Sequence, residues 1–108
     1  MDVASPTPAR DAEGYLVDPE TWSEDWAQAV ARELDIVLGE DHWEVIRFMR
    51  QYYAERQVAA DARFVIKLLD VRYPKKGRAR LFELFPYGYV GQACKIAGMK
   101  KPRAWSTG

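Results

Sequence analysis

A regular set of polar side chains, three or four positions apart, runs through the stretch VLGEDHWEVIRFMRQYYAERQ at 37–57: Glu44, Arg47, Gln51 and Glu55. Apolar and aromatic side chains occupy most of the remaining circumference: Trp43, Val45, Ile46, Phe48, Met49, Tyr52 and Tyr53. A helix with so wide an apolar surface is buried on most of its sides. The pattern therefore predicts the central helix of the core, with Gly39 as its N-cap.

Apolar positions before this helix also recur at helical spacing. Asp18 is a good N-cap, and Pro19 suits the first helical position, where its missing N–H costs nothing. Trp22 and Trp26 follow four positions apart, and the periodicity continues to Leu34. We expect one helix from Pro19 to about Leu34.

Three further short helices are predicted after the central one. The stretch ADARFVIKLLDVRYP gives a helix ended by Pro74, in which the inward-facing side chains are expected to be Phe64, Val65, Leu68 and Leu69. ARLFELFP gives a helix that stops before Pro86, since the residue before proline avoids the α region. YVGQACKIAG gives a helix of about two turns with Gly98 as its C-cap.

Residues at both ends lack this periodicity. Residues 1–13 are polar and contain two prolines, so we expect a frayed segment, followed by a short extended piece near residues 14–17. Residues 99–108 have no periodicity, and Pro102 blocks further helix. The expected fold is α+β but predominantly α. It is a compact array of about five short helices with a small N-terminal β element and a flexible C-terminal arm, in one domain spanning residues 1–108.

Composition narrows the class of protein. No stretch approaches the roughly 20 apolar residues that span a bilayer, and the N-terminus lacks the basic start and apolar run of a signal peptide. One cysteine cannot form an internal disulfide. We therefore expect a cytoplasmic protein with no membrane partner.

Charge is segregated although the net charge is zero. Residues 1–44 carry twelve acidic and two basic side chains, whereas residues 45–108 carry four acidic and fourteen basic ones. Either the two halves attract each other in the fold, or the second half presents a basic face to an acidic partner. We favour the first interpretation, because a compact domain brings its halves together.

Most enzyme sites are absent from the sequence. With one histidine and one cysteine, the chain has no pair of either to hold a metal, and no glycine-rich phosphate loop follows a strand. We expect no metal, no other cofactor and no independent catalytic site. His42 follows Asp41 at the start of the central helix, where we expect it to cap or pack rather than act as a base.

Cys94 is the one candidate for chemistry. A thiol on a short helix is usually a small buried hydrophobe. However, Lys95 is adjacent and three further basic residues follow within nine positions, Lys100, Lys101 and Arg103. Their positive field could lower the pKa of the thiol. The residues alone leave both interpretations open.

Several stretches resemble the DsrC/TusE family of sulfur-relay proteins over about residues 13–105. The resemblance is carried by EGYL at 13–16, Trp22, HWEVIRF at 42–48, YY at 52–53, LFPYG at 84–88, QACKIAG at 92–98 and KP at 101–102. Each stretch is short, but their order and spacing are specific together.

The resemblance implies a function and a site. Family members have a helical fold with a small N-terminal β element and a flexible C-terminal arm that typically reads CxxAGLPKPxGC. The last cysteine of that arm carries persulfide sulfur, which it receives from sulfurtransferases of the TusBCD or DsrEFH type. It passes the sulfur toward a tRNA-thiolation enzyme or works with sulfite reductase. The upstream cysteine can form a disulfide or trisulfide with it.

This chain departs from that arm at the decisive position. Cys94 matches the upstream cysteine, but Trp105 stands where the terminal cysteine is expected, and Met99 and Lys100 replace the Leu-Pro of the arm. Tyr89 and Gly91 also depart from the family pattern. An indole cannot do thiolate chemistry, so ordinary relay through the arm and an internal disulfide are both excluded.

Three hypotheses follow. We favour a non-relay homologue that binds or regulates a sulfurtransferase or another sulfur-metabolism protein. Its arm and partner-binding residues would be Lys95, Gly98, Lys101, Pro102, Arg103 and Trp105, because tryptophan is a frequent binding anchor. The second is a one-cysteine carrier that accepts persulfide on Cys94, which requires an exposed and partly ionised thiol.

The third hypothesis is a DNA-binding regulator. It rests on the basic residues around the helix junctions of the second half: Arg72, Lys75, Lys76, Arg78 and Arg80. A solvated basic face explains the same residues, and we favour that interpretation.

Overall fold

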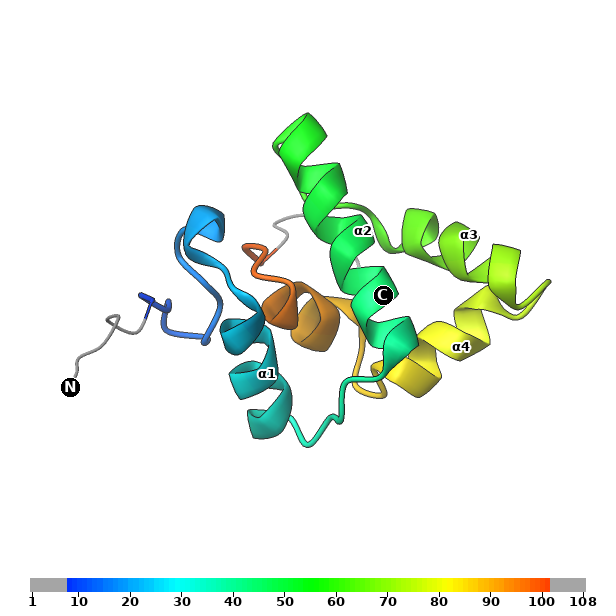
Figure 1. Ribbon diagram of the computed structural model, residues 1–108, viewed down its shortest axis with the longest axis horizontal. Coiled ribbons are helices and arrows are strands. Elements are labelled where there is room, and N and C mark those ends of the chain that lie inside the picture. Colours follow the sequence, from blue (N-terminus) through cyan, green and yellow to red (C-terminus); the bar gives the residue numbers. More distant parts are fainter. Residues whose placement is uncertain (1–7, 102–108) are drawn as a thin grey trace.

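The computed structural model describes residues 8–101 of the chain, and the described part is predominantly helical. A short 3-10 helix, η1 (Pro19–Thr21), precedes α1 (Glu24–Glu33), α2 (Glu40–Arg56), α3 (Ala62–Arg72) and α4 (Gly77–Leu84). A π-helix, η2 (Tyr89–Cys94), ends the series. Figure 1 shows α2 crossing the middle of the molecule, with α1 on one side of it and the α3–α4 hairpin on the other.

The central helix forms where its pattern predicts. Gly39 is the N-cap, and Val45, Ile46 and Met49 are fully buried. Gln57 adopts a left-handed conformation that ends the helix. The segment after α4, orange in Figure 1, lies between α1 and α2, so residues as far along the chain as Met99 contribute to the core.

The prediction of one helix from Pro19 to about Leu34 is wrong in one respect: the segment forms two separate elements, η1 and α1. Asp18 caps only η1, by accepting a hydrogen bond from the backbone N–H of Glu20. The chain is then extended at Trp22, and Ser23 provides a second N-cap by accepting from the N–H of Trp26. Two capping side chains five positions apart thus divide the periodic segment.

The third helix ends before Pro74 as predicted, but two side chains differ from expectation. Val65 and Leu69 are fully buried, whereas Leu68 is only partly buried and Phe64 is 39% exposed. The Phe64 ring stacks on Tyr52 of α2, with ring centroids 5.6 Å apart. Phe64 therefore covers the surface between α2 and α3 rather than filling the core.

The expected N-terminal β element is not seen among residues 8–101. That part of the chain contains no strand, only an isolated antiparallel bridge between Arg10 and Leu16. Asp11 closes the turn between them by accepting from the N–H groups of Glu13 and Tyr15. The Arg10 guanidinium donates to both oxygens of Glu33, which holds this turn against α1.

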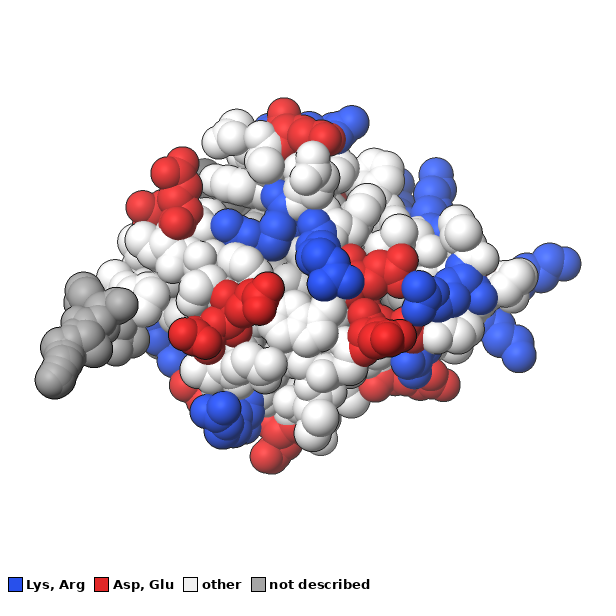
Figure 2. Space-filling view, in the orientation of Figure 1, with Lys and Arg blue, Asp and Glu red and all other residues white. Residues whose placement is uncertain are grey.

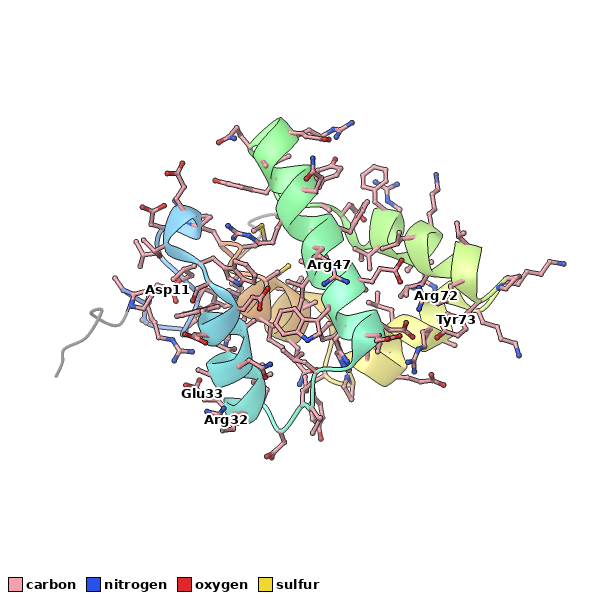
Figure 3. All side chains as sticks on the ribbon, viewed as in Figure 1. Asp11, Arg32, Glu33, Arg47, Arg72 and Tyr73 are labelled. Atoms are coloured by element: carbon pink, nitrogen blue, oxygen red, sulfur yellow. The ribbon has the colours of Figure 1, made fainter. Side chains whose placement is uncertain are left out.

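The segregated charges meet within the fold, as the favoured interpretation predicts. Asp41, at the start of α2, is only 6% exposed and pairs with Arg72 and Arg80 at 2.8 Å. The Tyr73 hydroxyl donates to the same carboxylate. Figure 3 shows Arg72 and Tyr73 at the end of α3, beside α4. The Tyr73 hydrogen bond and then Arg80 hold the pKa of Asp41 below its usual range.

Candidate functional site

Cys94 is the last residue of η2, and the helical path continues to Ile96. Gly98, at φ +79°, then ends the helix. Its N–H donates to the Lys95 carbonyl, and the N–H of Met99 donates to the Cys94 carbonyl at 2.9 Å. This pair of bonds is a Schellman motif, which confirms Gly98 as the C-cap.

The Cys94 side chain is fully buried. Burial raises the pKa of the thiol to about 12, and a hydrogen bond with Tyr89 offsets only part of that effect. Tyr89 is itself buried, and its hydroxyl donates to the Ala60 carbonyl between α2 and α3. A thiol in this setting stays protonated at neutral pH. The exposed, partly ionised thiol that a one-cysteine carrier requires is not present in this structure.

The neighbouring lysines do not supply the positive field that their spacing suggests. The Lys95 ammonium lies over the Tyr15 ring, 4.9 Å from its centroid. The Lys101 ammonium forms an ion pair with the Glu13 carboxylate at 3.0 Å. Lys100 is exposed to solvent. Because these ammonium groups have other partners or face solvent, burial decides the protonation of Cys94.

Three side chains bind the carbonyl groups at the end of the Cys94 helix. The indole N–H groups of Trp26 and Trp22 donate to the carbonyls of Lys95 and Ile96, each at 3.0 Å. Arg50 of α2 donates to the Ala97 carbonyl at 3.1 Å. The Ile96 and Ala97 carbonyls would otherwise lack partners at a helix C-terminus, whereas the Lys95 carbonyl also accepts from the N–H of Gly98. Trp22, Trp26 and Arg50 are hereafter the carbonyl-binding cluster.

Two features require a glycine at position 98: its positive φ and the lack of space for a side chain. A Cβ atom there would lie 2.5 Å from Cδ1 of Trp22 and 3.0 Å from a guanidinium nitrogen of Arg50. The backbone thus approaches the carbonyl-binding cluster as closely as a glycine allows. Met99, which the sequence assigns to the arm, is fully buried.

Sequence reasoning missed the role of the carbonyl-binding cluster. The two tryptophans at a four-residue spacing predict a core-facing stripe, and Trp26 is indeed buried. Nothing in the spacing says that both indole N–H groups meet carbonyls about seventy positions later. The tryptophan N–H needs a partner when buried, and that is the only signal available beforehand.

His42 caps and packs, as expected. The N–H of Gly39 donates to its Nδ1 at 3.0 Å, and its Nε2 lies 2.9 Å from the Leu84 carbonyl. Its ring meets the edge of Phe85. These partners define the neutral tautomer with the proton on Nε2. Burial lowers the pKa of His42.

The basic residues that suggest DNA binding do not form one free face. Arg72 and Arg80 are paired with carboxylates on α2 and α4, including that of Glu83. The other three side chains of that set are exposed to solvent: Lys75, Lys76 and Arg78. Two of the five basic side chains are thus neutralised by their neighbours.

Three predicted site residues, Pro102, Arg103 and Trp105, lie outside the described residues. Within residues 8–101, no three metal-ligating side chains come together, and no helix is long and apolar enough to cross a membrane. The described part of the predicted site therefore consists of Cys94, Lys95, Gly98 and Lys101.

Comparisons with known proteins agree with this fold. The family model described as "DsrC like protein" matches residues 2–104. A protein named sulfurtransferase TusE from Pectobacterium atrosepticum is 45% identical over 98 residues, which is 89% of this chain and 90% of that protein. The TusE of Photorhabdus laumondii is 44% identical over 85% of both chains.

Solved structures show the same similarity. The oxidized gamma-subunit of the dissimilatory sulfite reductase (DsrC) from Archaeoglobus fulgidus superimposes with a TM-score of 0.85 at 32% identity, over 98% of both chains. DsrC from Allochromatium vinosum gives a TM-score of 0.80 at 37% identity, over 98% of this chain and 96% of that one. The chain belongs to the DsrC/TusE family of sulfur-relay proteins.

Proposed function

We propose that this protein is a binding member of the sulfur-relay family, which docks on a partner of sulfur metabolism without carrying sulfur itself. The observation that carries the proposal is the complete burial of Cys94, with a thiol pKa raised to about 12. The sequence adds that Trp105 stands at the position of the family's sulfur-carrying cysteine. No other thiol exists in the chain.

The proposed partner is a sulfurtransferase of the TusBCD or DsrEFH type, in the reducing cytoplasm. The similarity to a protein named as the gamma-subunit of dissimilatory sulfite reductase supports a role within an assembly. A partner that recognises the family fold would also recognise this chain, because the fold is kept over nearly its whole length.

A one-cysteine carrier is the second candidate. The names of the TusE relatives, all sulfurtransferases, favour it over a purely binding role. It requires a local opening around residues 94–99 that exposes Cys94, since only a thiolate attacks a persulfide sulfur.

One experiment separates the two candidates. The full chain is incubated with a persulfidated sulfurtransferase of the TusBCD type, and its intact mass is compared with that of Cys94→Ala. Complex formation is followed in parallel by binding of the chain to the immobilised sulfurtransferase. A competent two-cysteine relative serves as the positive control for transfer.

We expect binding without any gain of sulfur. A gain of one sulfur atom that reductant removes and that Cys94→Ala lacks would replace the proposal with the one-cysteine carrier. Absence of both binding and transfer, with the control relative active, would contradict both candidates.

A further inference from the structure

A groove of about 440 Å³ lies between α2 and the junction of η1 with α1. Its α2 wall is formed by side chains three or four positions apart, which share one face of the helix: Trp43, Arg47, Arg50, Gln51 and Ala54. Trp22 and Glu24 form the opposite wall. Figure 3 shows Arg47 on the side of α2 that faces the viewer.

Two arginines line the groove without an acidic partner in the described part of the chain, although Glu24 is on the opposite wall. Among residues 8–101, neither Arg47 nor Arg50 forms an ion pair. The Arg50 guanidinium is half-buried, lies 4.6 Å from the centroid of the Trp22 ring and donates only to carbonyls. Removing a cation from water without a counter-charge is costly, and an anion in the groove would relieve that cost.

Most other arginines of the described chain differ from this pair. Five of them form ion pairs with a carboxylate: Arg10, Arg56, Arg63, Arg72 and Arg80. Two more, Arg32 and Arg78, are exposed and without an ion pair like Arg47, but neither of them lines the groove. Among residues 8–101, this groove alone brings together two arginines without an ion pair and two tryptophan rings.

We propose that this groove is the docking site for an acidic peptide segment of the partner protein, with an apolar side chain of that segment seated between Trp22 and Trp43. The assignment rests on the proposed binding function and names the surface that performs it. Arg47 and Arg50 pair with carboxylates of the segment, and the two partly buried indoles provide the apolar contact.

The charges around the groove favour a peptide over a nucleic acid. Figure 2 shows basic side chains over the middle of α2 with acidic side chains on both sides of them. A nucleic-acid strand needs a continuous basic track for its phosphates. Glu24 on the groove wall interrupts the positive charge, and it can accept hydrogen bonds from the N–H groups of a peptide backbone.

The test is a titration of the isotope-labelled full chain, followed by NMR. The probe is an acetylated and amidated hexapeptide of four acidic residues and two leucines. A hexapeptide with lysines in place of the acids and a single-stranded hexauridylate are titrated separately. The variant is Arg47→Glu, and the matched control is Arg78→Glu, which reverses an equally unpaired arginine on α4.

We expect the acidic peptide to shift the indole N–H signals of Trp22 and Trp43. Arg47→Glu should weaken its binding about tenfold, Arg78→Glu by less than about twofold, and added salt should weaken it further. No saturable shift of these signals, or equal effects of the two variants, would overturn the proposal. Tighter binding of hexauridylate would assign the groove to nucleic acid instead.

The proposal would also be contradicted if either of two other segments occupied the groove. Groove signals that shift with protein concentration in the absence of peptide would assign the groove to a second copy of the chain. Signals of residues 102–108 that shift on Arg47→Glu alone would assign it to the chain's own C-terminal residues.

Binding to the immobilised sulfurtransferase separates this proposal from the proposed function. If the sulfurtransferase binds the wild type and Arg47→Glu equally, docking occurs elsewhere and only the groove assignment fails. If it binds neither, while the acidic peptide still binds in an Arg47-dependent manner, the groove stands and the proposed partner is wrong.

Discussion

At the scale of one residue, Cys94 shows that basic neighbours in the sequence do not by themselves make a thiol reactive. Its neighbours are basic, and that pattern is typical of an activated thiol. In the fold, those ammonium groups turn to Tyr15, Glu13 and solvent, and the thiol itself is buried. Burial therefore determines its protonation, and burial follows from contacts that the local sequence does not contain.

Cys94 should be inert in the native protein. With a thiol pKa of about 12, its thiolate fraction at pH 8 is about a thousandfold below that of an ordinary cysteine. Iodoacetamide should modify it at least about a hundred times more slowly in the folded protein than in denaturant. Equal rates in the two conditions would show that Cys94 is exposed, and would support the carrier.

His42 should make stability depend on pH. Its pKa is lowered in the folded state, so the unfolded state binds the proton more readily. The contribution of the neutral ring is present above about pH 6.5 and is lost as the pH falls below that value. The difference in unfolding free energy between wild type and His42→Ala should thus shrink from pH 7.5 to pH 5, as measured in urea. A difference independent of pH would contradict the lowered pKa of His42.

At the scale of elements, helices with a wide apolar pattern were predictable and their interruptions were less so. The pattern placed α2 and its Gly39 cap correctly, because burial and capping act within one segment. It missed the break at Ser23, since a periodic apolar stripe continues across it. The π-helical form of η2 could not be read from the sequence either, because its packing against distant residues selects that path.

The carbonyl-binding cluster should stabilise the Cys94 helix. Trp26→Phe keeps most of the buried ring but removes the N–H that binds the Lys95 carbonyl. We expect a loss of about 1 kcal/mol in unfolding free energy, since one hydrogen bond is removed while the carbonyl keeps the N–H of Gly98 as a donor. Trp43→Phe is the control, because its indole N–H has no hydrogen bond within the described chain.

The same variant gives a second measurement. Amide hydrogen exchange at Gly98 and Met99 should accelerate in Trp26→Phe, because their Schellman bonds depend on the helix end that Trp26 supports. If Trp43→Phe were as destabilising as Trp26→Phe, loss of ring contacts rather than of the hydrogen bond would be the cause.

At the scale of the whole molecule, one carboxylate links three helices. Asp41 of α2 binds Arg72 and Tyr73 at the end of α3 and Arg80 of α4. The uneven distribution of charge along the chain predicted that its halves attract each other. The sequence could not name Asp41 among twelve acidic candidates, because the choice depends on how α3 and α4 meet α2.

Asp41→Asn should be strongly destabilising. It leaves Arg72 and Arg80 without their shared buried carboxylate, and breaking such a pair costs on the order of 3 kcal/mol. Glu44→Gln, which removes only the more exposed partner of Arg72, should cost less than about 1 kcal/mol. Thermal unfolding of the two variants measures the difference. Similar losses would show that Asp41 acts as an ordinary surface charge.

The hydrogen bonds that join the two ends of the chain also determine when the fold can be completed during synthesis. Tyr15, Trp22 and Trp26 donate to the carbonyls of Val90, Ile96 and Lys95, which the ribosome adds about seventy residues later. The N-terminal segment and α1 therefore leave the exit tunnel long before their partners exist. The native contacts of both tryptophans form only after residue 96 has emerged, so the nascent chain cannot bury these side chains in their native setting before then.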